Sequence, residues 1–177
     1  MRKLTMAELN RMSSSEFVNS EKRRITLILE NIRSGLNVGS IFRIADAFAL
    51  EKLILCGITP QPPHREILKT ALGATDSVQW EYRPDAISAI SDLRKRRYVI
   101  WPVEQTDKSH MLDNWTWNNA QPLALIFGNE VHGVSDAVLA ELEESIEIPQ
   151  FGTKHSLNVA VSVGIVVWHV LQSRQSR

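Results

Sequence analysis

Short apolar runs recur along the chain and alternate with stretches in which apolar residues return every three or four positions. The runs predict strands at residues 25–29, 52–56, 77–82, 98–103, 123–127 and 146–148. The first run is continuous rather than alternating, as in strands that are covered on both faces. Helical spacing predicts helices at residues 38–49, 66–72, 84–97 and 135–144. Strands that alternate with helices predict an α/β fold with a mostly parallel sheet and helices on both faces.

The C-terminal stretch from Val159 to Leu171 is apolar on every face. Its β-branched content suits a strand, but its length favours a helix. A helix without a polar face must be buried, either in a core or between subunits. Ser156 is the predicted N-cap of this helix, and Asn37 is the predicted N-cap of the helix after the first strand. In the plainer interpretation, this last helix and the strand before it only close the core.

The first 24 residues are mostly polar and contain capping-box patterns at residues 5–8 and 13–16. These patterns predict two short helices that pack on the body of the protein or on a partner. We therefore divide the chain into an N-terminal helical extension, residues 1–24, and one domain, residues 25–177. The second part is long enough to bury a substantial core.

Two basic clusters and a pair of tryptophans admit more than one interpretation. Residues 22–24 are expected to form a solvated edge, with RNA contact as the alternative. Residues 94–97 fall in the last turn of a predicted helix, where cations interact favourably with the helix dipole. Trp115 and Trp117 lie in a long connection, and such tryptophans often cover an apolar edge or mark an interface.

Composition limits the classes of partner. The chain has 177 residues and a formal net charge of zero, so any RNA binding must use local patches. The single cysteine, Cys56, lies in an apolar run, which predicts a buried strand residue and excludes a disulfide framework. The N-terminus has no apolar leader and the longest apolar run is short of a membrane span, so a cytoplasmic location is expected.

Several common site chemistries lack their sequence patterns. No Gly-x-Gly-x-x-Gly opens a helix after the first strand, so the dinucleotide fingerprint is missing. Gly128 and Gly133 have P-loop spacing, but the required Lys and Ser/Thr do not follow them. The five histidines show no ligand spacing, so no metal is expected. A serine hydrolase built from Ser156, His155 and Glu130 would lack the nucleophile elbow.

Three polar loops follow the C-terminal ends of predicted strands, at residues 31–37, 128–133 and 150–158. In an open α/β sheet, ligands bind outside the carboxyl ends of the strands, so the loops should converge on one site. The side chains expected there are Asn37, Arg43, Glu130, Ser156 and Asn158. A site rich in backbone amides and poor in titratable bases suits recognition of a nucleoside-like ligand better than hydrolysis.

The same loops carry motifs in a fixed order. Asn37 is followed six residues later by Arg43, and Ala-Asp-Ala at 45–47 continues this segment. Residues 126–135 read Ile-Phe-Gly-Asn-Glu-Val-His-Gly-Val-Ser, and residues 148–161 include Ile-Pro-Gln and Ser-Leu-Asn-Val-Ala-Val. Together these segments resemble the three motifs of the SpoU/TrmH family of SPOUT RNA methyltransferases. Gln150-Phe151 departs from the family, because many members carry Met and then Gly there.

The resemblance implies S-adenosyl-L-methionine as methyl donor and a ribose 2′-hydroxyl of tRNA or rRNA as acceptor. It also implies a homodimer and a C-terminal trefoil knot, against the general rule that chains do not thread loops. By the same resemblance, the catalytic pocket is formed by Asn37, Arg43, Glu130, Ser156 and Asn158. The residues expected at the cofactor are Phe127, Gly128, Asn129, Glu130, Ile148, Gln150, Ser156 and Leu157.

Two alternatives remain open at this point. Because a guanidinium stays protonated in proteins, we interpret Arg43 as a clamp on a phosphate rather than as a base. In the structural alternative, Arg43 pairs with Asp46 three positions further along the helix. The second functional hypothesis is a nucleotide- or RNA-binding module that kept the fold and lost catalysis. The presence of both Arg43 and Asn37 favours the enzyme.

Overall fold

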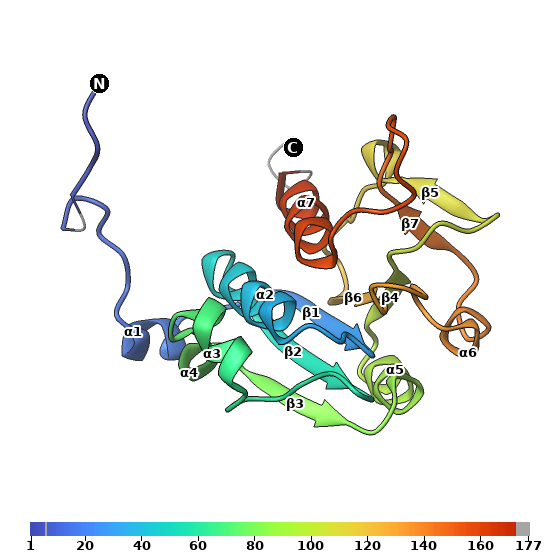
Figure 1. Cartoon of the computed structure of the whole chain (residues 1–177), viewed down its shortest axis with the longest axis horizontal. Coiled ribbons are helices and arrows are strands. Elements are labelled where there is room, and N and C mark those ends of the chain that lie inside the picture. The colour runs from blue at the N-terminus through green and yellow to red at the C-terminus, as the bar shows by residue number, and fades with distance from the viewer. Residues whose placement is uncertain (6, 173–177) are drawn as a thin grey trace.

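The computed structural model describes residues 1–5 and 7–172. Within these residues, five parallel strands form one sheet in the order β3-β2-β1-β6-β4 (Figure 1). Their bounds are Arg23–Glu30 for β1, Leu50–Cys56 for β2, Trp80–Arg83 for β3, Val99–Pro102 for β4 and Leu123–Phe127 for β6. A second, smaller sheet pairs β5, Ser109–Met111, with β7, Ser145–Glu147. The parallel sheet that the apolar runs predict is therefore confirmed.

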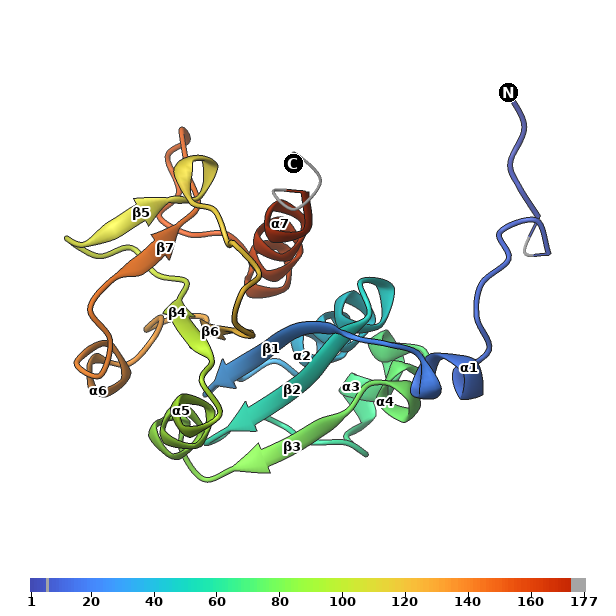
Figure 2. The same cartoon turned by 180° about the vertical axis from the view of Figure 1, so that it is seen from behind.

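Helices cover both faces of the large sheet (Figures 1 and 2). One face carries α2 (Gly35–Ala47), α3 (Arg65–Ala71), α4 (Ala74–Ser77) and α7 (Val159–Gln172), and the other carries α5 (Ala86–Lys95) and the short α6 (Asp136–Leu139). Successive residues of a strand point to opposite faces. Leu27 and Leu29 accordingly join the core under α2, whereas Ile28 joins the core under α5. Two-sided burial explains why the run in β1 is continuously apolar.

Two glycines on α2 let α3 lie directly against it. A side chain at Gly39 would begin 2.1 Å from Thr70 Oγ1 and 2.4 Å from the carbonyl oxygen of Ile67. Gly35 is similarly close to His64 and Glu66. The Thr70 hydroxyl donates a hydrogen bond of 2.9 Å to the Leu36 carbonyl across this contact. Because the two helices touch along their backbones, α3 holds the first half of α2 in place at the end of β1.

Of the two short helices predicted in the N-terminal extension, the second is present and the first is not. Helix α1, Ser14–Asn19, has the predicted capping box between Ser13 and Glu16, and its Phe17 is buried in the core under α2. The first predicted helix is wrong, because residues 7–10 form a turn. The hydrogen bonds between Thr5 and Glu8 close that turn without extending it. The segment before α1 runs away from the body (Figure 1), and a domain boundary after residue 24 stays a prediction.

Several predicted elements change where tertiary packing outweighs the local pattern. The third strand begins at Trp80 rather than at residue 77, because residues 74–77 form α4. The helix predicted to reach residue 144 ends at Leu139. The connection at 105–121 contains β5 and a 3₁₀ turn, Leu112–Asn114, and its Trp115 and Trp117 are buried in the main core. Trp115 packs edge-on against Trp101 of the edge strand β4, with ring centroids 5.6 Å apart, which agrees with the expectation that it covers an apolar edge. An interface role for these tryptophans stays a prediction.

Helix α7 is present, but it is not buried all round. Val163, Val166, Val167 and Val170 are fully buried. On the opposite side, three apolar side chains are exposed: Val161 by 50%, Ile165 by 38% and Trp168 by 55%. The helix therefore closes the core with one face and presents a second apolar face outward. The trefoil knot that the resemblance implies stays a prediction.

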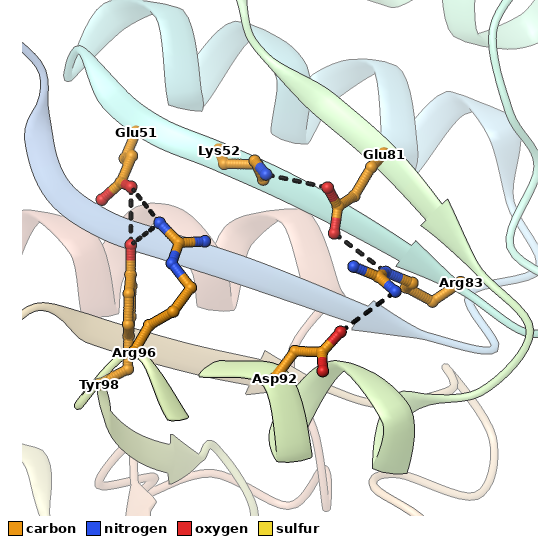
Figure 3. A network of polar contacts seen from close by, with 7 residues as sticks. All are labelled: Glu51, Lys52, Glu81, Arg83, Asp92, Arg96 and Tyr98. Carbon is orange, nitrogen blue, oxygen red and sulfur yellow. Dashed lines mark hydrogen bonds and ion pairs between the residues drawn. The ribbon is translucent and has the colours of Figure 1, made fainter. Parts of the chain in front are cut away.

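A polar network crosses the α5 side of the sheet (Figure 3). It comprises Glu51, Lys52, Glu81, Arg83, Asp92, Arg96 and Tyr98. Glu81 accepts hydrogen bonds from Lys52 Nζ at 2.9 Å and from Arg83 Nε at 3.0 Å. The Tyr98 hydroxyl donates to Glu51 at 2.6 Å. The network ties β2 and β3 to α5 at an edge of the sheet that no further strand covers within the described residues.

Cys56 ends β2 and is buried, as predicted. Burial, reinforced by the nearby Glu30 carboxylate, raises the pKa of its thiol to about 12. No helix among the described residues is long and apolar enough to cross a lipid bilayer.

Candidate functional site

The loops after β1 and β6 are joined by the carboxylate of Glu130. It accepts hydrogen bonds from the backbone N–H of Arg33 at 2.8 Å, from the backbone N–H of Ser34 at 3.0 Å and from Asn37 Nδ2 at 2.9 Å. Two of these donors are backbone groups at the start of α2, where N–H groups have no partner within the helix. Glu130, in the turn after β6, thus accepts hydrogen bonds from N–H groups that a residue next to the helix would otherwise cap.

Asn158 connects the third loop to the same point. Its Nδ2 donates to Asn37 Oδ1 at 3.0 Å, and its Oδ1 accepts from the backbone N–H of Ala160 at 2.9 Å. Asn158 therefore caps α7 and fixes Asn37 at once. The convergence of the three loops, predicted from their positions after strand ends, is confirmed.

Both predicted helix caps are wrong. The N-cap of α2 is Ser34, whose hydroxyl accepts from the backbone N–H of Asn37 at 3.3 Å. Asn37 itself lies in the first turn and turns its amide toward Glu130 and Asn158. Asn158, rather than Ser156, caps α7. Asn37, the predicted cap of α2, and Asn158, the observed cap of α7, are thus parts of one tertiary junction.

The junction favours the ionised form of Glu130. Burial by itself would raise the pKa of this carboxyl. Hydrogen bonds from the Arg33 amide, the Asn37 side chain and the Ser34 amide outweigh burial, so the pKa lies below its ordinary value. Glu130 is therefore a fixed negative charge at neutral pH and accepts from donors that hold the loops together.

The turn at residues 128–133 is held by Asn129. Its Nδ2 donates to the carbonyl of Asn31 at 2.7 Å, and its Oδ1 accepts from the backbone N–H groups of Val131 and His132 at 2.9 and 3.1 Å. Gly128 is required by the same turn, because a side chain there would begin 2.1 Å from the backbone of Gly133 and Val134. The glycine is explained by packing within the chain.

Sequence reasoning missed two carboxylates behind this turn. Glu30, at the end of β1 and 6% exposed, accepts from Ser135 N at 3.0 Å and from Ser135 Oγ at 2.6 Å. Glu104, which follows β4, accepts from the backbone N–H of Val134 at 2.8 Å. The available signal was a lone acidic residue directly after each of two apolar strands. Both carboxylates thus hold the end of the turn in place by accepting hydrogen bonds from it.

A cavity of about 310 Å³ lies beside the junction. Its walls come from the ends of β6 and β7, the turn at 128–133 and the loop at 150–157. All eight residues expected at the cofactor line it, and so do His155 and Val159. Apolar side chains such as Phe127, Ile148 and Leu157 alternate with backbone amides and polar groups around the wall. This mixture is typical of sites for small organic ligands with both an apolar part and polar groups.

Ser156 and Arg43 are placed differently from the other three predicted side chains. Ser156 lines the cavity, and within residues 1–5 and 7–172 it makes no hydrogen bond. Arg43 lies on the exposed side of α2, outside the cavity lining. Its guanidinium makes no ion pair or hydrogen bond with any described residue, and Asp46 instead accepts from the Ser77 hydroxyl at 2.6 Å. The structural alternative of an Arg43–Asp46 pair is therefore wrong.

The basic run at residues 94–97 is largely engaged elsewhere. Arg94 pairs with Glu141 at 2.7 Å, Lys95 with Asp92 at 3.3 Å and Arg96 with Glu51 at 3.4 Å. These pairs agree with a structural role for the run. In the part of the chain that the structure describes, no group of three or more His, Cys, Asp or Glu side chains is placed to hold a metal ion.

The junction and the cavity lie within a known family pattern. Residues 24–168 match the model of the SpoU rRNA Methylase family. The chain belongs to this family. The match contains all three loops, the Glu130 junction and most of α7.

Two curated proteins are similar to most of this chain. The tRNA (guanosine(18)-2′-O)-methyltransferase of Thermus thermophilus is 26% identical over 174 residues, which cover 98% of this chain and 87% of that protein. The 23S rRNA (guanosine-2′-O-)-methyltransferase RlmB of Neisseria meningitidis serogroup B is 28% identical over 156 residues, which cover 88% of this chain and 61% of that protein.

Solved structures share the fold. The A. aeolicus TrmH/SpoU tRNA modifying enzyme superposes with a TM-score of 0.79 at 21% identity, covering 92% of this chain and 81% of that one. The SpoU methyltransferase AviRb from Streptomyces viridochromogenes, in complex with AdoMet, gives a TM-score of 0.77 at 22% identity, covering 91% of this chain and 62% of that one. These likenesses agree with the layered parallel sheet described above.

Proposed function

We propose that this SpoU-family chain is an RNA methyltransferase that uses S-adenosyl-L-methionine to methylate a ribose 2′-hydroxyl in tRNA or rRNA. The observation that carries the proposal is the Asn37–Glu130–Asn158 junction beside a cavity of about 310 Å³. Two relatives that cover most of this chain are named as a tRNA and a 23S rRNA 2′-O-methyltransferase. Family membership and the site therefore support the same chemistry.

The cavity suits the cofactor by size and lining. Apolar walls at Phe127, Ile148 and Leu157 fit a nucleobase, and backbone groups around Gly128 and Gln150 offer hydrogen-bond partners to polar groups. When bound there, the cofactor supplies an electrophilic methyl group on a sulfonium. The chain's part is to hold it with strand-end backbone and to exclude water on one side. We propose Phe127, Gly128, Asn129, Glu130, Ile148, Gln150, Ser156 and Leu157 as its binding residues.

On the acceptor side, we propose a division of labour. Asn37, Glu130 and Asn158 hold one another, and both ends of the Asn37 amide are occupied. They act as positioning residues that fix the three loops. Glu130 is an ionised acceptor for three donors, so it serves better as a fixed charge than as a proton acceptor. Exact placement of reacting groups can supply a large part of a rate enhancement.

In addition to lining the cofactor cavity, Ser156 is proposed to contact the RNA, as is Arg43. Both lack hydrogen-bond partners in the described chain, so their donors are available to a substrate. We propose that Arg43 binds a phosphate beside the acceptor ribose, orienting the 2′-hydroxyl and stabilising negative charge as it develops. A guanidinium suits this role because its planar fork matches phosphate oxygens.

We propose a homodimer built on the outward face of α7. Val161, Ile165 and Trp168 form an exposed apolar stripe, and the exposed Leu36 of α2 lies on the neighbouring helix. Contiguous exposed apolar surface of this kind marks interaction sites, and a two-fold interface lets one patch cover its own copy. A second copy would provide the burial that the sequence of α7 demands.

The second candidate function is a nucleotide- or RNA-binding module without catalysis. It shares the cavity with the first proposal but needs no positioned acceptor. The unpaired Arg43 favours the enzyme, because a purely structural arginine would have kept a partner such as Asp46.

Methyl transfer from S-adenosyl-L-methionine to bulk tRNA and to rRNA tests the proposal directly. Arg43→Ala should keep near-normal melting and near-normal affinity for S-adenosylhomocysteine, yet slow single-turnover transfer by about a hundredfold or more. Arg43→Lys should rescue little, since a point charge does not reproduce the fork. Arg97→Ala is the matched control, because Arg97 is exposed just before β4 and its side chain makes no ion pair or hydrogen bond with any described residue.

One result would count against the proposed function and another against its proposed mechanism. Binding of S-adenosylhomocysteine and RNA by the wild-type chain without any methyl transfer would favour the binding module. Wild-type transfer by Arg43→Ala would leave the reaction standing but remove Arg43 from its mechanism.

A further inference from the structure

The loop that closes one side of the cavity carries an aromatic side chain with no role inside the chain. We call residues 150–157 the cavity loop, because Gln150, His155, Ser156 and Leu157 line the cavity. Phe151 is 97% exposed, and every residue from 151 to 158 is exposed. Single exposed apolar residues are ordinary on protein surfaces. An almost fully exposed phenylalanine two residues after Pro149, in a loop that lines a cavity, is a more specific feature.

The body of the protein does not hold the cavity loop. Within the described chain, residues 150–157 make no hydrogen bond, either by backbone or by side chain. Apart from its two chain neighbours, no residue has an atom within 4 Å of the position where a side chain at Gly152 would begin. The segment between β7 and α7 projects from the body beside β5 (Figure 1). Phe151 therefore contributes nothing to the core, and the loop can adjust to a bound molecule.

The cavity loop contains basic residues and no acidic ones. Residues 150–157 contain Lys154 and His155 and no acidic residue. Lys154 is exposed and has no ion-pair partner among the described residues. Proteins that bind single-stranded nucleic acid combine aromatic side chains, on which bases stack, with cations that track the phosphate backbone. Phe151 and Lys154, three residues apart on an unsupported loop, provide this combination at the mouth of the cavity.

We propose that Phe151 stacks on a nucleobase of the RNA next to the acceptor ribose and that Lys154 contacts a backbone phosphate of the same strand. The inference rests on the proposed function and adds to it an RNA-binding element. The cofactor is a poorer occupant, because Phe151 is not part of the cavity wall. A second copy of the chain is also a poorer occupant, because the neighbours of Phe151 are polar or cationic.

A stacking contact depends on the base and should disappear with it. The test measures the affinity of the full chain, saturated with S-adenosylhomocysteine, for a short single-stranded oligoadenylate and for an abasic strand of equal length. Phe151→Ala should weaken oligoadenylate binding roughly fivefold or more and leave the abasic strand nearly unaffected. Phe151→Trp should preserve the preference for the strand with bases. Tyr82→Ala, which removes an exposed aromatic from β3, should change neither affinity.

The phosphate contact has a separate signature. Lys154→Ala should weaken binding of both strands alike and reduce the slope of log affinity against log salt by about one counterion. An unchanged slope would remove Lys154 from the proposal.

Four outcomes would overturn the stacking role. Wild-type protein could show no preference for the strand with bases, or Phe151→Ala could weaken both strands equally. The same variant could lower the affinity for S-adenosylhomocysteine, which would place Phe151 at the cofactor. It could also dissociate the dimer, which would place it at the subunit interface. Binding is measured without methyl transfer, so failure here alongside normal wild-type transfer leaves the proposed function intact.

Discussion

Replacing Glu130 by Gln tests whether the junction is as strong as its geometry indicates. Oε1 accepts from Ser34 N and Asn37 Nδ2, and Oε2 accepts from Arg33 N. A glutamine keeps one oxygen, so its amide nitrogen faces at least one donor, and the remaining bonds lose their charge. A hydrogen bond to a charged group contributes about 1.5–3 kcal/mol and a neutral one roughly half as much. With partial exposure taken into account, we expect Glu130→Gln to lower the free energy of unfolding by about 2–3 kcal/mol at neutral pH.

The stability difference between wild type and Glu130→Gln should also depend on pH. Because the pKa of Glu130 is lowered in the folded protein, its stabilising effect is fully present above its ordinary value of 4.5. The effect is lost as the pH falls through the lowered folded pKa, because the wild-type side chain then becomes neutral like glutamine. The difference between wild type and Glu130→Gln should therefore shrink on acidification.

Denaturant unfolding at one fixed protein concentration, at neutral pH and at about pH 4, measures both the difference and its pH dependence. A fixed concentration matters because the stability of the proposed homodimer would vary with it. Glu143→Gln is the matched control, since Glu143 is exposed and has no partner among the described residues. Equal unfolding free energies for wild type and Glu130→Gln at neutral pH would refute the reasoning. A large difference that does not change with pH would show that charge is not its source.

Three further predictions follow from packing. Gly39→Ala should destabilise the fold by about 1–3 kcal/mol, because its side chain would overlap Thr70 and Ile67. Gly164→Ala, whose nearest neighbour would be 3.8 Å away, should be neutral or stabilise by up to about 1 kcal/mol, and the reverse order would contradict the packing. Cys56 should react slowly with thiol reagents in the folded protein and quickly once unfolded, because burial raises its pKa to about 12; fast native reaction would be inconsistent with this. Trp168→Asp should shift sedimenting species from dimer to monomer, and a wild-type chain that sediments as monomer at micromolar concentration would disprove the homodimer.

The sequence by itself determined the architecture and the location of the site. Continuous apolar runs mark strands buried on both faces, and each run was separated from the next by a helical pattern or a loop. Because the strands are parallel, their carboxyl ends meet at one edge, so polar loops after β1 and β6 had to lie together. The motif order from Asn37 to Asn158 adds the family to this picture. These inferences depend on periodicity and chain direction, which are local properties of a sequence.

The tertiary structure decided which partner each polar side chain found. Asn37 looks like an ordinary N-cap, but Glu130, 93 residues away, makes it part of a junction that also includes Asn158. Rules for helix capping consider only backbone groups close by in the sequence, so they do not predict a contact with a carboxylate so far along the chain. The same limit applies to Trp115 and Trp117, which a long connection folds back into the core. It applies also to α7, whose apolar faces are alike in sequence and become different only because α2 and the 3₁₀ turn at Leu112–Asn114 pack against one side of it.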